Sequence, residues 1–287
     1  MKRRATVPQS RVMPGFKVLH QIRESSIIAV IVLPIAMLNV AHSDPMIDTL
    51  VDSYPDHLAG YENGYLVWKD GTRTAVSDDR HEKTFEELLE APDILDQFAI
   101  RYSVGTPTAI PRINEDPGRI RNAAFFRKMY GDCERGEVAK HLRTVSWLPN
   151  RGGGTVLVTA VNGVAEKLAA VSRELSQLPA KFTRYLVPSE GAYNCRVIAS
   201  TNRPSMHAFG AAIDLNSRFG DYWLWTKSKE GKFDWKNRIP LEIVDVFERH
   251  QFIWGGKWFH YDTMHFEYRP EIIALAKKGW PQRPEAR

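Results

Sequence analysis

The hydrophobic pattern is clearest in residues 151–287, where it predicts strands interspersed with helices. A β-rich run at 155–160 is followed by apolar positions at helical spacing, and Asn162 is placed to cap the helix that they predict. Pro179 then ends this helix, because proline cannot continue the backbone hydrogen-bond pattern.

Further along, a second helix is expected over residues 240–250, since proline suits a first helical turn. Strands are expected at 196–200, 211–216 and 265–268. In the middle strand the apolar residues alternate, which places Asp214 on the opposite face from them. The pattern predicts an α+β domain, with helices flanking a single antiparallel sheet.

Residues 44–150 are expected to form an N-terminal extension. An apolar run at 65–68 lies between two turn signals, as in a β-hairpin. An acidic, leucine-containing stretch at 81–96 predicts a short helix that Pro92 ends. Residues 97–150 are irregular and rich in arginine; we expect a surface covering layer, with the wall of a binding cleft as the alternative.

Charge is distributed unevenly along the chain. The 287 residues carry a net charge of +5, and residues 1–43 account for all of it, with six basic side chains against one acid. The remainder is neutral, with 33 basic and 33 acidic side chains. A neutral body has no long-range attraction for phosphate backbones, so no nucleic-acid partner is expected.

Residues 1–43 have the pattern of an export signal. A basic segment precedes the apolar run 27–38, and Ala41-His42-Ser43 offers small residues where a signal peptidase cleaves. The apolar run is shorter than the roughly 20 residues that span a bilayer. Cleavage after Ser43 is the favoured interpretation and an uncleaved N-terminal membrane anchor is the alternative. Both predict an exported protein of the periplasm or cell envelope.

Two cysteines, Cys133 and Cys195, follow the leader. In an oxidising compartment such a pair can form a disulfide, and their spacing neither requires nor forbids it. The sequence leaves a bridge and two free thiols both open, and it does not define an oligomeric state.

Candidate chemistry is concentrated in two stretches, 205–214 and 254–267. They offer His207 and Asp214, seven residues apart, and then His265. A catalytic zinc needs three nitrogen or oxygen ligands and one open position, and this trio satisfies that count. By spacing alone, a buried hydrogen-bonding aspartate is the alternative for Asp214.

The first stretch resembles the S-x-H-x-x-G-x-A-x-D motif of the LAS zinc peptidases, and every defined position is present. This family comprises D-alanyl-D-alanine carboxypeptidases and dipeptidases, and L-alanyl-D-glutamate endopeptidases. The second stretch is similar to the W-G-G…D-x-x-H-F-E ending of the VanY-related, endopeptidase-like branch. The resemblance covers roughly residues 150–275.

The resemblance implies that His207, Asp214 and His265 bind Zn²⁺ and that Asp262 is the general base and then acid. Many relatives have glutamate in that role, so the shorter Asp262 leaves its reach to the reacting water open. Glu267 is the rival base, although a supporting role suits it better.

Other candidates surround these residues. Arg196 lies where relatives place an arginine that contacts the substrate or developing negative charge; a structural ion pair is the alternative. Ser205 and Tyr193 are candidates for substrate binding. His260 is expected to be an ordinary surface or cleft histidine. An aromatic cluster is expected to pack in the core or a lid rather than bind sugar; it comprises Tyr222, Trp223, Trp225 and Trp235.

The implied activity is zinc-dependent hydrolysis of peptidoglycan stem peptides. The D-alanyl-D-alanine carboxypeptidase reaction is favoured, and cleavage of the L-alanyl-D-glutamate bond is the first alternative. A non-catalytic zinc-containing module that binds cell-wall peptides or a partner is the second, although Asp262 argues against it.

Overall fold

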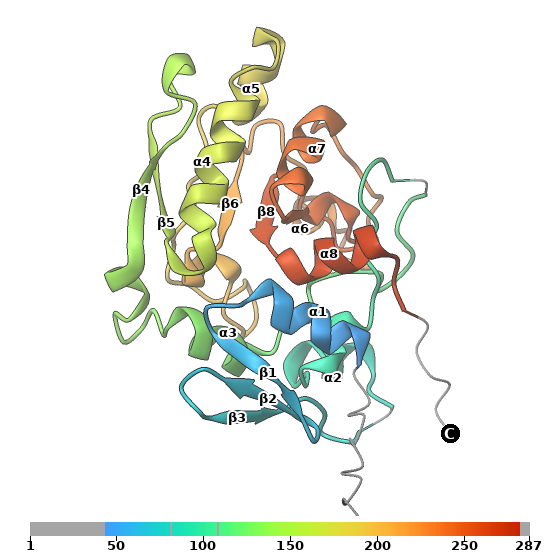
Figure 1. The fold of residues 1–287 in the computed structure, drawn as a ribbon. Coiled ribbons are helices and arrows are strands. Elements are labelled where there is room, and N and C mark those ends of the chain that lie inside the picture. The colour runs from blue at the N-terminus through green and yellow to red at the C-terminus, as the bar shows by residue number, and fades with distance from the viewer. Residues whose placement is uncertain (1–43, 81, 108, 282–287) are drawn as a thin grey trace, which may run out of the picture. The chain divides into compact units, whose positions relative to one another are not determined.

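The computed structural model describes residues 44–80, 82–107 and 109–281. The predicted leader, residues 1–43, lies outside this part, so signal peptide and membrane anchor both stay predictions. No described helix is both long enough and apolar enough to cross a membrane. The α-helices are α1 Pro45–Ser53, α2 Phe85–Glu90, α3 Ala123–Tyr130, α4 Val164–Leu175, α5 Thr183–Leu186, α6 Trp223–Thr226, α7 Leu241–Arg249 and α8 Pro270–Lys278 (Figure 1).

The described strands form three small antiparallel sheets, with strand orders β1-β2-β3, β4-β5 and β6-β8-β7. Their bounds are β1 Leu58–Glu62, β2 Tyr65–Trp68, β3 Arg73–Ala75, β4 Leu142–Ser146, β5 Thr155–Thr159, β6 Ala212–Asp214, β7 Phe252–Trp254 and β8 His265–Tyr268. Helices with antiparallel sheets make an α+β fold, which confirms the predicted class. The strands after residue 150 are divided between two sheets, because β5 pairs with β4.

The predicted hairpin is formed by β1 and β2. Asn63 and Gly64 connect the strands with φ values of 50° and 82°, the positive values that a type I′ turn requires. The short helix predicted before Pro92 is α2. It begins with a capping box, in which the Thr84 side chain accepts from the Glu87 amide and the Glu87 side chain accepts from the Thr84 amide.

Residues 97–150 contain more regular structure than the sequence predicted. The side chain of Asn122 accepts from the amide of Phe125 and caps α3, and β4 follows. Since β4 pairs with β5 from Leu142 opposite Thr159 to Ser146 opposite Thr155, the boundary predicted at residue 150 falls between two paired strands.

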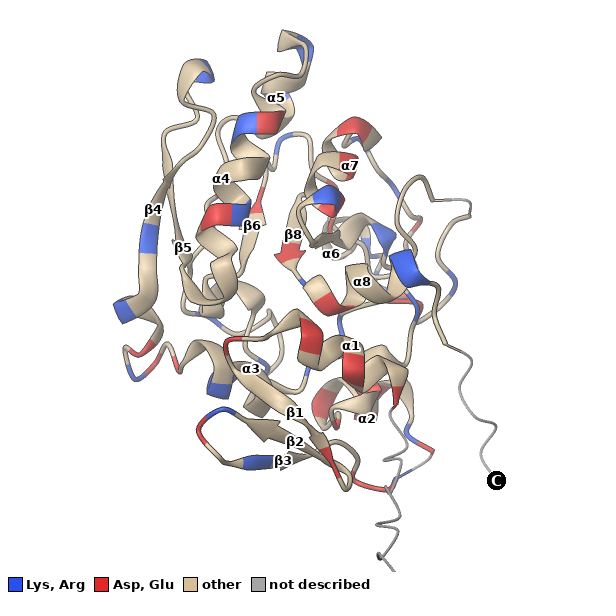
Figure 2. Cartoon of the chain, viewed as in Figure 1, with Lys and Arg blue, Asp and Glu red and all other residues tan. Residues whose placement is uncertain are grey.

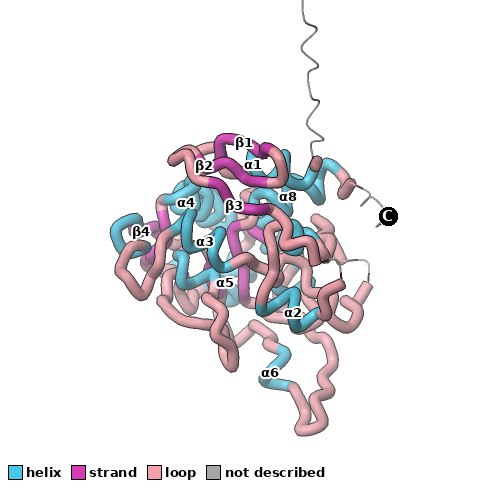
Figure 3. The backbone as a smooth tube through the Cα atoms, turned by 90° about the horizontal axis from the view of Figure 1, so that it is seen from below, coloured by secondary structure: helices cyan, strands magenta, loops and turns pink. Residues whose placement is uncertain are grey.

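One apolar core connects the N-terminal and C-terminal elements. It includes Leu50 of α1, Phe126 of α3, Leu168 of α4, Phe247 of α7 and Phe266 of β8. Helix α1 packs against α8, and the two lie side by side in Figures 1 and 3. The N-terminal helix therefore packs against the C-terminal helix, which follows β8.

Basic and acidic residues are interspersed along the described helices and loops, as Figure 2 shows. This distribution agrees with the neutral charge balance of the chain after residue 43.

Two local predictions are wrong. Asn162 does not cap α4, because the cap position is taken by Gly163. Asn162 has φ 56°, and its Nδ2 donates to the Met129 sulfur. The turn from β5 into α4 needs positive φ at both residues, which asparagine tolerates. The strand predicted at 196–200 is absent; Val197 makes a single bridge to Pro204.

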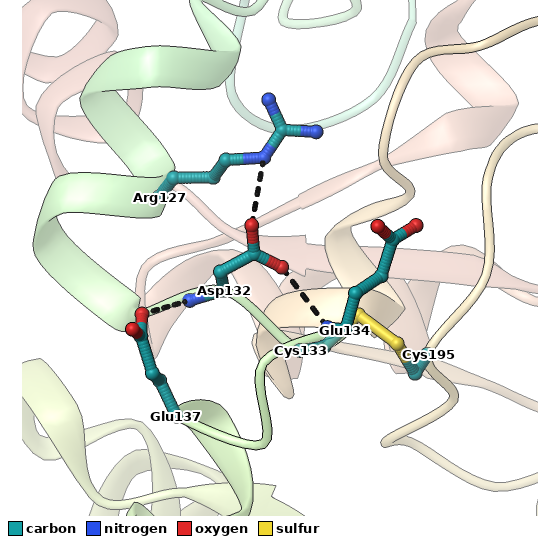
Figure 4. Close-up of a disulfide and its surroundings, with 6 residues drawn as sticks. All are labelled: Arg127, Asp132, Cys133, Glu134, Glu137 and Cys195. Atoms are coloured by element: carbon teal, nitrogen blue, oxygen red, sulfur yellow. Dashed lines mark hydrogen bonds and ion pairs between the residues drawn. A yellow bond between two sulfur atoms is a disulfide. The ribbon is translucent and has the colours of Figure 1, made fainter.

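Cys133 and Cys195 form a disulfide, which answers the question that the sequence left open (Figure 4). Cys133 follows α3, and its loop is held by the Asp132 carboxylate, which accepts from the Glu134 amide at 2.9 Å. The bridge joins this loop to the residue directly before Arg196.

We expect the Cys133→Ala, Cys195→Ala double variant to lose about 4 kcal/mol of unfolding free energy. The bridge spans a sequence separation of 62 residues, and the chain entropy released on opening such a loop gives about that value. Denaturant unfolding with and without reductant measures it. A difference below about 1 kcal/mol between the oxidised wild-type protein and the double variant would contradict this expectation.

Candidate metal centre

His207 is held by a short 3-10 helix, Met206–Phe209, that comes directly before β6. Ser205 begins this turn by accepting a hydrogen bond from the His207 amide, and Gly210 ends it with φ 66°. A Cβ at Gly210 would lie 2.9 Å from the amide nitrogen of Thr159 on β5. Glycine is therefore required both for the backbone conformation and for the close approach to β5.

Asp214 and His265 are brought together by strand register. Strands β6 and β8 are antiparallel, and Asp214 is the direct partner of His265. Residues directly opposite in such a ladder project from the same face. The fold thus places side chains 51 residues apart in sequence next to each other.

The three predicted ligands converge on one point. His207 Nε2 lies 3.1 Å from Asp214 Oδ2, and His265 Nδ1 lies 3.0 Å from Asp214 Oδ1. The two ring nitrogens are 3.2 Å apart. One potential ligand atom from each residue lies within 4.8 Å of the others, so a single ion can contact all three.

The other nitrogen of each imidazole is bonded to the protein. His207 Nδ1 lies 2.5 Å from the carbonyl oxygen of Ala192, so this nitrogen donates to the carbonyl and Nε2 faces the cluster. His265 Nε2 lies 3.0 Å from Glu267 Oε2, which leaves Nδ1 for the cluster. Such partners fix the orientation of metal-binding histidines.

Glu267 belongs to a buried charge network that reaches the N-terminal helix. Its Oε2 accepts from Arg121 at 2.7 Å, and its Oε1 lies 3.3 Å from Arg269. Arg269 also pairs with Glu271 at 2.6 Å, and Glu271 accepts from the Tyr54 hydroxyl at 2.7 Å. Glu267, Arg269 and Glu271 are almost fully buried, so each charge needs its partners.

These contacts shift three pKa values, and each shift favours the charged form of the side chain. Burial lowers the pKa of His265, but its bonds to Asp214 and Glu267 outweigh burial and raise that pKa to about 10. Burial opposes ionisation of Asp214 too, yet His207 and His265 hold its pKa well below the usual range. Burial likewise opposes ionisation of Glu267, and Arg121 is the main group that lowers its pKa to about 2.

A cavity of about 440 Å³ opens onto this cluster. Asp214 and His265 line it, as does Asp262. The other lining residues include Arg119, Arg121, Arg196, Ser205, Tyr222, Trp225, Trp258 and His260. An ion held by the three ligands would therefore be reachable by a molecule in the cavity.

Asp262 has an unusual environment. Its Oδ1 is buried and has no hydrogen-bond partner among the described residues. Burial, and then the negative charge of Asp214, raise the pKa of this carboxyl to about 7. A side chain in this state can both accept and release a proton near neutral pH. A cation bound by Asp214 would lower that pKa.

The remaining predicted site residues are placed differently. Arg196 is exposed and lines the cavity, and Ser205 lines it while its hydroxyl caps the turn of His207. Tyr193 is not among the residues that line this cavity. His260 lines it as well, with its Nδ1 2.6 Å from Asp116 Oδ2, in agreement with a cleft histidine.

For residues 97–150, the alternative prediction describes the part of the segment that reaches the site. Arg119 and Arg121 come from this segment and line the cavity, so here it forms a cleft wall, the alternative to a covering layer. No motif marked them, since their relation to the site depends on tertiary packing. Tyr222 and Trp225 of the aromatic cluster also line the cavity, and Trp225 is 60% exposed.

Residues 199–268 match a protein family described as D-alanyl-D-alanine carboxypeptidase. The matched span contains both motifs, and it confirms the predicted resemblance to these peptidases. It begins after Arg196 and does not include Arg119 or Arg121. Comparisons with curated proteins and with solved structures found no match.

We expect Glu267→Gln to weaken zinc binding by about 10- to 100-fold, the usual effect of removing the partner that orients a ligating histidine. It should also lower the unfolding free energy by about 3 kcal/mol, because Arg121 and Arg269 lose a buried counter-charge. Zinc titration against a competing chelator and denaturant unfolding of the metal-free protein measure the two effects.

Glu242→Gln is the matched control for that variant, since Glu242 is exposed at the start of α7. It should change neither quantity. Unaltered zinc affinity in Glu267→Gln would show that Glu267 does not orient His265.

Proposed function

We propose that this protein is a zinc-dependent peptidase of peptidoglycan stem peptides and that it cleaves the D-alanyl-D-alanine bond. The observation that carries the proposal is the convergence of His207, Asp214 and His265 at the wall of a cavity that Asp262 also lines. The family match over residues 199–268 supports the same substrate class.

The donor set fits zinc, which favours imidazole nitrogen together with carboxylate oxygen. Three protein ligands beside a cavity are typical of a catalytic site, whereas a structural zinc usually has four. When bound, zinc lowers the pKa of water toward about 7 and polarises a carbonyl group.

Asp262 is the proposed general base. It lines the cavity, and its Oδ1 has no partner among the described residues, so it is free to accept a proton from the attacking water. The same carboxyl then delivers the proton to the nitrogen of the leaving amine.

Glu267 is less suited to this role. Its side chain is fully buried, and its two oxygens are occupied by His265, Arg121 and Arg269. Proton transfer by Glu267 would break the contacts that orient His265. We therefore assign it to positioning.

Arg196 is proposed to stabilise the negative charge that develops on the carbonyl oxygen. Its backbone carbonyl accepts from the Ser205 amide at 3.1 Å, and the disulfide partner Cys195 precedes it. These contacts fix the backbone of Arg196 beside the turn that carries His207.

Two other functions are alternatives to the proposed carboxypeptidase reaction. Cleavage of the L-alanyl-D-glutamate bond would use the same residues, and the description of the matched family favours the D-alanyl-D-alanine bond. A non-catalytic zinc module would need neither Asp262 nor the cavity beside the ligands. Either activity agrees with export to the cell envelope, as the pattern of residues 1–43 predicts.

We predict that His207→Ala and His265→Ala each abolish zinc binding and hydrolysis together. Asp262→Asn should instead keep one zinc per chain while turnover falls by about 10²- to 10⁴-fold, the usual range for a lost general base. Metal analysis by mass spectrometry and release of D-alanine from a stem peptide provide the two measurements.

His141→Ala is the control, because His141 is exposed and is not among the residues that line the cavity. An Asp262→Asn protein that turns over at the wild-type rate would remove Asp262 from the role of base. Full zinc occupancy in both histidine variants would contradict the ligand assignment.

The bond cleaved is predicted to be the terminal D-alanyl-D-alanine bond. Mass spectrometry of purified muropeptides after digestion should then show pentapeptide stems losing one alanine. Release of L-alanine-terminated glycan and a free peptide beginning with D-glutamate would identify the endopeptidase reaction instead.

A further inference from the structure

Arg119 lines the cavity of the candidate site but lies outside the matched family segment. Its side chain is only 12% exposed, and its guanidinium lies 5.4 Å from the centre of the Trp258 ring. A cation this close to an aromatic face is held in place. Arg119 is thus a largely buried side chain that is held against Trp258 at the wall of the cavity.

The turn that carries Arg119 is fixed to the segment before Asp262. Asp116, fully buried, accepts from the His260 amide at 2.8 Å and contacts the His260 ring at 2.6 Å. The Trp258 indole donates to the Pro117 carbonyl at 2.7 Å. The position of Arg119 is therefore set before any ligand arrives.

A glycine makes this attachment possible. Gly118 has φ 88°, and its carbonyl accepts from Arg269 at 2.6 Å. A Cβ at this position would lie 2.3 Å from the Ile253 side chain. The turn consequently lies close against β7 and the buried charge network.

Most of the hydrogen-bonding capacity of Arg119 is unused. Within the described residues it makes one hydrogen bond, from Nη1 to the His260 carbonyl at 3.2 Å. Its nearest carboxylate, Asp116, is 3.6 Å away and already bonded to His260. Its Nε and Nη2 make no hydrogen bond within the described residues, and they are not fully buried, so a ligand can reach them.

The other two arginines of the cavity differ from Arg119. Arg121 is paired with the buried Glu267. Arg196 is exposed and is assigned to the carbonyl oxygen. Of the three arginines, Arg119 is thus the one that is both fixed in position and free to donate from Nε and Nη2. Two parallel N–H donors of this kind match the two oxygens of a carboxylate.

We infer that Arg119 binds the α-carboxylate of the amino acid whose nitrogen leaves, an inference that rests on the proposed function. The terminal D-alanine of a stem peptide has this carboxylate. The D-glutamate of the alternative substrate has one too, since it continues through its side-chain carboxyl. A segment outside the family match therefore supplies the group that selects a free carboxylate beside the scissile bond.

The test compares a peptide ending in D-Ala-D-Ala with its C-terminal carboxamide. Binding is measured by calorimetry on zinc-loaded Asp262→Asn protein, and kcat/KM is measured on protein with Asp262 intact. We expect the acid to be preferred by about 10- to 100-fold, the value of a charge-assisted bidentate contact. Arg119→Gln should remove that preference while changing the carboxamide values less than about twofold.

Two further variants define the role. Arg119→Lys keeps the charge but loses the fork, so part of the preference should remain. Arg112→Gln is the matched control, because Arg112 lies in the same segment and is 89% exposed; it should keep the full preference.

Three results would overturn the inference: an acid preference that survives Arg119→Gln, an equal loss for acid and carboxamide, or no acid preference before substitution.

The calorimetry separates failure of this inference from failure of the proposed function. Absence of turnover with an Arg119-dependent acid preference in binding would reject the peptidase and keep the carboxylate site. Turnover whose preference for the acid does not depend on Arg119 would keep the peptidase and reject the carboxylate site.

The endopeptidase alternative has its own probe pair. If the L-alanyl-D-glutamate bond is the one cleaved, the carboxamide peptide is replaced by a stem with D-isoglutamine in place of D-glutamate. The same loss of preference in Arg119→Gln is expected, and its absence would again overturn the inference.

Discussion

The pairing of β6 with β8 is the constraint on which the site depends. Asp214 faces His265 across an antiparallel ladder, and a slip of one residue would turn one of them to the other face of the sheet. Glu267, two residues after His265 and so on the same face, reaches back to its ring at 3.0 Å. Register therefore sets one ligand pair and the partner that orients it, while the turn at Gly210 adds His207.

Buried charges link the N-terminal part of the chain to this sheet. Through Glu267, the charge of the site is linked to Arg121 and Arg269, and through Glu271 to Tyr54 at the end of α1. Because these groups are buried, removal of one leaves another without a partner. The stability of the N-terminal packing and the geometry of the candidate metal centre are therefore coupled.

Much of the site could be predicted from the sequence, because its residues lie in two short stretches whose order and spacing can be recognised. His207, Asp214 and His265 converge as expected, and the hairpin at Asn63-Gly64 forms as its turn residues indicate. Arg119 could not be predicted, since its place in the cavity depends on contacts with a segment about 140 residues away. Asn162 was assigned as a cap because local propensity cannot distinguish a capping asparagine from one that adopts positive φ.

The crystal structure of the zinc-loaded protein, with anomalous scattering at the zinc edge, tests the central claim most directly. The account predicts one zinc per chain, bound by His207 Nε2, an oxygen of Asp214 and His265 Nδ1, with solvent in the remaining position beside Asp262. A zinc enclosed by four protein ligands, or no anomalous peak between these three side chains, would contradict it.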